Sequence, residues 1–256
     1  MLVTASLTLL SLVCSAALAL SGVGSPLAVA HLAFAVGIVP LIFAAMSHFV
    51  PVLTRTGSPS LTIARLPGMA QMAGLFAVLA MQGIIPHWLL SLAAAVDLVL
   101  AGILLNWMAS RARATLGSPH PGWRWYALAL GCLMMALLAV LLIDIWPAYW
   151  KPLRLFHLHF NTIGLVGLAA LGTLPVLMPT ALGKPDPDAG SWLRRRLWLV
   201  AGGALIVATG AAVVWAFAVP GAALILVAAL GLLGQWIRRF GLKVLISDGV
   251  SASLLT

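Results

Sequence analysis

Charge is scarce in this sequence. Of 256 residues only 7% are charged and only five are acidic, whereas 63% are hydrophobic. A water-soluble domain of this size needs a far more polar surface, so the composition excludes one. The apolar residues come in runs long enough to cross a lipid bilayer as helices. We therefore predict an all-α integral membrane protein whose surroundings are lipid.

Several chemical motifs are also missing. There is no Cys-x-x-Cys-His motif, phosphate-binding loop or nucleophile–base pair, which excludes covalently attached haem and the commonest nucleotide and hydrolase sites. The two cysteines, Cys14 and Cys132, lie inside apolar runs, where packing is their usual role. The net charge of +9 comes from basic residues scattered over short loops, so no nucleic-acid partner is expected.

The apolar runs predict a bundle of about eight transmembrane helices in a single domain, 1–256. The first run lacks a basic leader segment and is about one bilayer long, so we expect a retained helix and not a signal peptide. The expected spans are 2–20, 26–53, 68–86, 88–109, 124–146, 153–181, 197–218 and 220–240.

The positions of lysine and arginine predict the orientation. Twelve of the fourteen lie in or beside 54–67, 110–123, 182–196 and the carboxyl-terminal tail, whereas the opposite side holds only Lys151 and Arg154. Cytoplasmic loops carry the excess of basic residues. We therefore expect a multi-pass protein of a bacterial inner membrane with both termini in the cytoplasm.

The two halves of the chain share a spacing. Pro51 follows His31 after twenty positions, and Pro179 follows His159 after the same interval. Each pair lies on the second helix of its half. This suggests two parallel repeats, 1–122 and 123–256.

His31 and His159 are the first candidate functional residues. Each lies five or six residues into its expected helix, which is roughly 7–9 Å below the outer surface at about 1.5 Å per residue. Imidazole is a good ligand for haem iron, and two at one depth suit the two axial positions of one haem b. The alternative is that both histidines only bond to backbone and join helices.

His157 lies on nearly the opposite face of the helix from His159, with Asn161 one turn further on. It could ligate a second haem or a copper ion oriented by Asn161, or it could simply pack. Nearby, Lys151, Arg154 and Trp150 could hold haem propionates that point outward, or form an interfacial belt.

Asp97 lies in the middle of the fourth expected helix. A carboxylate at this depth needs a partner or a proton. It keeps a second class of function open, a transporter in which histidines and Asp97 line a path for a metal ion or a proton.

The histidine helices resemble a known family. The stretch from His157-Leu-His159-Phe through Gly164 to Leu177-Met-Pro179 resembles the His-x-His helix of haem–copper oxidase subunit I. The stretch from His31-Leu-Ala-Phe to His48-Phe-Val-Pro51 resembles the earlier histidine helix of that family. The NnrS membrane haem–copper proteins, linked to nitric oxide, are a second resemblance.

This resemblance implies that His31 and His159 clamp a low-spin haem and that His157 faces a second centre. The chain has no His-Pro-Glu motif or paired histidines between the two helices, so the copper ligands of the oxidases are missing. We expect electron transfer or redox chemistry of nitric oxide or another diatomic gas. The question of oxidoreductase activity stays open. The expected partner is a redox protein at the outer face or the subunits of a respiratory complex, and a third possible role is that of an accessory or assembly subunit.

Overall fold

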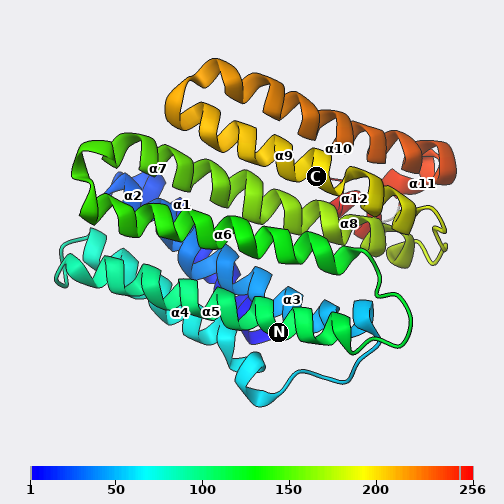
Figure 1. Cartoon of the computed structure of the whole chain (residues 1–256), viewed down its shortest axis with the longest axis horizontal. Helices are drawn as coiled ribbons and strands as arrows, with labels where there is room; N and C mark the ends of the chain where they lie inside the picture. The colour runs from blue at the N-terminus through cyan, green and yellow to red at the C-terminus, as the bar shows by residue number, and fades with distance from the viewer. Residues whose placement is uncertain (1, 248, 256) are drawn as a thin grey trace. The chain divides into compact units, whose positions relative to one another are not determined.

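The computed structural model describes residues 2–247 and 249–255 (Figure 1). The chain is 86% helical, and the described residues contain no strand. Among the described residues, eight helical spans are long and apolar enough to cross a membrane. Leucine, valine and tryptophan side chains are exposed along them, as lipid-facing surfaces require. The prediction of an all-α, multi-pass membrane protein is confirmed.

The eight spans agree with the predicted ones in number and order. Their bounds are Leu2–Ser21, Pro26–Thr54, Leu61–Met81, Trp88–Arg113, Gly122–Ile145, Pro147–Ala181, Ala189–Val213 and Trp215–Phe240.

Several predicted bounds differ from the observed ones by three residues or more, and three of the wrong starts have a clear physical cause. The third helix begins at Leu61 and not at 68, because Pro67 is accommodated inside it. In the sixth span the α-helix begins at Trp150 and not at 153, because Pro152 falls in its first turn, where a missing N–H removes no helix bond. The seventh begins at Ala189 and not at 197, so Arg194 and its two basic neighbours belong to the helix.

The chain forms two compact units. Unit 1 comprises the residues up to Pro119 together with Leu137–Ala148, and unit 2 comprises His120–Ala136 together with the residues from Tyr149 onward. The helix α6 (Gly122–Ile145) contributes its first part to unit 2 and its last part to unit 1. Whether the halves arose by duplication stays a prediction.

Unit 1 is built around a span that is interrupted by a π-helix. This span consists of α2 (Pro26–Ala33), the π-helix η1 (Phe34–Ile38) and α3 (Val39–Thr54). The unit also contains α1 (Leu2–Ser21), α4 (Leu61–Met81) and α5 (Trp88–Arg113).

Side chains of neighbouring helices satisfy the carbonyl groups of η1. Gln71 of α4 donates to the Val36 oxygen at 3.1 Å, and Thr8 of α1 donates to the Gly37 oxygen at 3.0 Å. A Cβ on Gly74 of α4 would lie 2.3 Å from the Ala35 oxygen, so α4 meets η1 backbone to backbone. Small residues permit this approach, and polar side chains join the helices.

Unit 2 repeats the interrupted span with different helices around it. The short η2 (Pro147–Tyr149) crosses from unit 1 into unit 2. It is followed by α7 (Trp150–His159), the π-helix η3 (Phe160–Gly167), α8 (Leu168–Ala181), α9 (Ala189–Val213), η4 (Trp215–Phe217), α10 (Ala218–Phe240), α11 (Leu242–Ser247) and α12 (Gly249–Ser253).

Trp125 of α6 is one of the fully buried large side chains of unit 2. Its ring is fully buried, stacks on Trp192 of α9 with 5.6 Å between centroids, and donates through Nε1 to the Leu193 oxygen at 3.0 Å. Gly172 of α8 lies against it, since a Cβ there would come within 2.5 Å of the Trp125 Cβ. Figure 1 shows α9 and α10 lying side by side as a hairpin.

Candidate functional site

Each unit contains a π-helix that begins within three residues after a candidate histidine. In unit 1, η1 begins three residues after His31, and in unit 2, η3 begins immediately after His159. π-Helices are rare and are found frequently at functional sites. The two histidine helices therefore share a backbone feature that the sequence pattern did not predict.

The two histidines also share a side-chain hydrogen bond. Nδ1 of His31 lies 2.8 Å from the Leu27 oxygen, and Nδ1 of His159 lies 2.8 Å from the Leu155 oxygen. A carbonyl oxygen only accepts, so each Nδ1 carries a proton, and in the neutral form of such a ring the lone pair is on Nε2. Metal-ligating histidines usually have this arrangement, in which a backbone carbonyl fixes the ring and the tautomer. The same bond satisfies the alternative that the rings only pack.

The predicted equal depth of the two histidines is not found when it is counted from the helix starts. His31 is the sixth residue of α2, whereas His159 is the tenth and last of α7. The difference arises because α7 includes Trp150, Lys151 and Pro152, which were expected to precede the helix.

His157 contacts different groups from His159. Its Nδ1 donates to the Ala136 oxygen of α6 at 2.9 Å, within unit 2. The Asn161 side-chain nitrogen lies 3.3 Å from both ring nitrogens, one turn along the helix as the spacing predicted. The Asn161 Oδ1 atom is buried and has no hydrogen-bond partner. A buried carbonyl oxygen of this kind is available to a ligand that donates a proton or carries positive charge.

The cations predicted near the histidines lie at the start of α7. The Arg154 guanidinium lies 5.8 Å from the centroid of the Trp150 ring, and both side chains are exposed. Lys151 is exposed as well, and no ion pair of Lys151 or Arg154 is found among residues 2–247 and 249–255. Both cations are therefore accessible to an anionic group at this end of the helix.

A metal ion can also be bound by protein side chains alone, without a haem. No group of three or more His, Cys, Asp or Glu side chains that could hold a metal ion is found in the described part of the chain. A haem iron takes at most two axial ligands from the protein, so this finding leaves haem open.

Asp97 is buried in α5 with 7% of its surface exposed, and its Oδ1 has no hydrogen-bond partner. Asp144, by contrast, accepts a hydrogen bond from the Ser91 hydroxyl. Of these two carboxyl groups, therefore, Asp97 is the one with a buried oxygen that has no hydrogen-bond partner.

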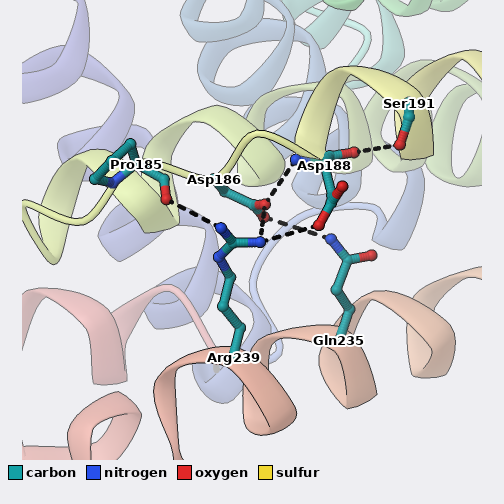
Figure 2. Close-up of polar contacts among 6 residues, drawn as sticks. All are labelled: Pro185, Asp186, Asp188, Ser191, Gln235 and Arg239. Atoms are coloured by element: carbon teal, nitrogen blue, oxygen red, sulfur yellow. Dashed lines mark hydrogen bonds and ion pairs between the residues drawn. The ribbon is translucent and has the colours of Figure 1, made fainter.

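A polar cluster at the loop between α8 and α9 was not predicted from the sequence (Figure 2). Arg239 of α10 pairs with Asp186 and Asp188, each at 3.0 Å, and Gln235 donates to Asp186 at 3.4 Å. The Pro-Asp-Pro-Asp run at 185–188 was the available signal, because aspartates between prolines are held in a rigid turn.

Comparison with known proteins adds no relative: no protein-family model, curated protein or solved structure matches the chain.

Proposed function

We propose that this chain is a membrane haem protein in which His31 and His159 are the axial ligands of one b-type haem. Its role is electron transfer or redox chemistry of a small diatomic gas such as nitric oxide. The observation that carries the proposal is the shared local structure of the two histidines. Each donates from Nδ1 to the carbonyl four residues earlier, and each is followed by a π-helix.

The hydrogen bonds prepare each ring for ligation. A carbonyl that accepts from Nδ1 raises the basicity of Nε2 and limits rotation of the ring, which lowers the entropy lost when Nε2 binds a metal. A haem bound in this way supplies a one-electron couple in an apolar environment, and two histidine ligands favour electron transfer over catalysis at that iron.

The cations at the start of α7 have a matching role. Lys151 and Arg154 would pair with the haem propionates, and Trp150 would offer an indole N–H at the same level. Arg154 already lies over the Trp150 ring, which limits the positions that its guanidinium can take.

His157 and Asn161 form a second candidate centre. The Asn161 amide group holds the His157 ring from one side and the Ala136 carbonyl holds it from the other. A second haem or a copper ion is the group this pair would bind, with the buried Asn161 Oδ1 facing a donor on the bound species.

Electron paramagnetic resonance on three single variants tests these assignments. His31→Ala and His159→Ala should each abolish the same low-spin signal, because loss of either axial ligand leaves haem five-coordinate or absent. His157→Ala is the matched control from the same helix and should keep that signal. If His157→Ala removes the low-spin signal and His159→Ala retains it, the assignment of the two histidines is wrong.

The surroundings of the protein complete the proposal. The basic residues favour a bacterial inner membrane with both termini in the cytoplasm, which puts His31 and His159 nearer the outer face. The redox partner would then be a protein at the outer face or a respiratory complex in the same membrane.

The second candidate function is transport of a proton or metal ion, and the buried, unpartnered Asp97 favours it. An intramembrane carboxyl group without a partner is commonly part of an ion pathway. The two functions differ in one spectrum, since a transporter without haem has no Soret band.

A further inference from the structure

Unit 2 has a cavity of about 450 Å³ where α8 ends and α9 begins. It lies beside the loop that carries the Asp186–Asp188 turn, on the side to which the basic residues assign the cytoplasm. Its walls differ in character. Pro175, Val176 and Pro179 of α8 form an apolar wall, and His120, Lys184 and Asp186 bring polar groups.

The backbone fixes Lys184 at the rim of this cavity. The Lys184 N–H donates to the Pro179 oxygen at 3.0 Å, and the Gly183 N–H donates to the Thr180 oxygen at 3.1 Å. Gly183 has φ +61°, so α8 ends in a Schellman motif. Such an end holds the following residue in one direction and thereby positions the ammonium-bearing side chain.

The two carboxylates near the cavity already form ion pairs with an arginine. Arg239, which belongs to α10 and does not line the cavity, pairs with both Asp186 and Asp188 (Figure 2). The Asp186 side chain is only 1% exposed, and its other contacts are the Asp188 N–H and the Gln235 amide. Lys184 therefore has no acidic partner here, and none is found for it in the described part of the chain.

His120 adds a neutral donor. Its Nδ1 accepts from the Gly122 N–H at 3.2 Å, so the ring proton is on Nε2. Burial, and next the charge of Arg194, lower the pKa of His120, which keeps the ring uncharged at neutral pH.

Arg194 folds back toward the same corner. Its Nη1 and the Pro121 ring lie 3.7 and 3.8 Å from the position that a Cβ on Gly190 would occupy. No ion pair of Arg194 is found among the described residues. Lys184 and His120 thus line the cavity together with an apolar wall, and Arg194, which does not line it, lies near enough to His120 to act on its charge.

We propose that this cavity binds a phosphate group, with Lys184 as its cationic ligand, the His120 Nε2–H as a neutral donor, and the positive charge of the nearby Arg194 adding attraction. Basic pockets at the cytoplasmic ends of transmembrane helices bind lipid headgroups. The apolar wall of α8 suits the glycerol and first acyl carbons of an anionic phospholipid. Free phosphate has the same charged chemistry and lacks those carbons. This site involves neither haem nor its ligands, so it stands or falls independently of the proposed function.

The test measures thermal unfolding of the full-length chain in detergent with three additives. These are a short-chain phosphatidylglycerol, phosphatidylcholine with the same acyl chains, and sodium phosphate, with sodium chloride of equal ionic strength as the reference. A ligand that binds the folded state raises the unfolding temperature as its concentration increases. Phosphatidylglycerol should raise it and phosphatidylcholine should not.

Two variants connect the effect to the cavity. The Lys184→Ala/Arg194→Ala double variant should bind phosphatidylglycerol about tenfold more weakly or worse, because it loses the charge-assisted hydrogen bond of Lys184 and the nearby positive charge of Arg194. Arg195→Ala removes the same charge from the adjacent exposed position and should bind as the unaltered chain does.

The outcomes separate the possibilities. If sodium phosphate stabilises as much as phosphatidylglycerol and the double variant loses the effect, the site stands and free phosphate is the source. Equal stabilisation by the two lipids, an unchanged response of the double variant, or no response to either anion would overturn the proposal.

Discussion

Arg239 makes two ion pairs of the same length that should differ widely in energy. Both distances are 3.0 Å, but the Asp186 side chain is 1% exposed and the Asp188 side chain is 65% exposed. An exposed pair contributes about 0–1 kcal/mol, whereas breaking a buried pair costs about 3–5 kcal/mol because one charge stays buried without its partner. Arg239 itself is 30% exposed, and Asp186 keeps its hydrogen bonds from Asp188 and Gln235. We therefore expect Arg239→Met to cost about 2–3 kcal/mol of unfolding free energy, below the full range.

The assay is equilibrium unfolding of the full-length chain in detergent micelles. Arg238→Met is the matched control, because Arg238 is the adjacent exposed arginine, and it should cost less than about 0.5 kcal/mol. Asp188→Asn should cost no more than about 1 kcal/mol. The double variant Arg239→Met/Asp186→Asn should be more stable than Arg239→Met alone, because the orphaned charge is gone. Equal costs for Arg239→Met and Arg238→Met would refute the reasoning, as would a double variant that is no more stable than Arg239→Met alone.

Three further predictions follow from the fold and the candidate site. Gly74→Ala should destabilise the chain by about 1–3 kcal/mol in the same unfolding assay, because its Cβ would lie 2.3 Å from a backbone oxygen of η1. The control Gly68→Ala lies on the same helix with open space around it and should be neutral or slightly stabilising. In a chain whose native cysteines are replaced, an impermeant thiol reagent added outside should label a cysteine in 147–152 and spare one in 186–190, and the reverse pattern would contradict the topology. In redox titration Arg154→Leu should lower the haem midpoint potential, because a nearby positive charge favours the reduced iron, and an unchanged or raised potential would count against a propionate contact.

Hydropathy was sufficient to predict the number of helices. A span is about twenty apolar residues long, so its summed hydropathy changes little when any single residue is changed. The ends of a span depend on single residues. The predicted starts next to Pro67 and Pro152 were wrong, because each proline indicates a helix boundary although the helix continues through it. The approach of Asn161 to His157 was predictable, because residues four apart share a helix face.

The π-helices and the Arg239 cluster could not be predicted in the same way. The extra residue in η1 is stabilised by contacts with other helices, among them the Gln71 bond to Val36, which lies 35 positions away. Arg239 meets Asp188 across 51 positions. Local periodicity carries no information about such pairs, because they depend on which helix faces pack together.

Haem content per chain decides whether His31 and His159 hold a haem. The full-length chain would be produced in haem-replete cells, purified in detergent and assayed as its pyridine haemochrome against protein concentration. The account predicts haem b at about one per chain, or two if the His157 centre also holds haem, and less than half of that in His31→Ala and His159→Ala. Purified protein without haem, or with haem content unchanged in both histidine variants, would contradict it.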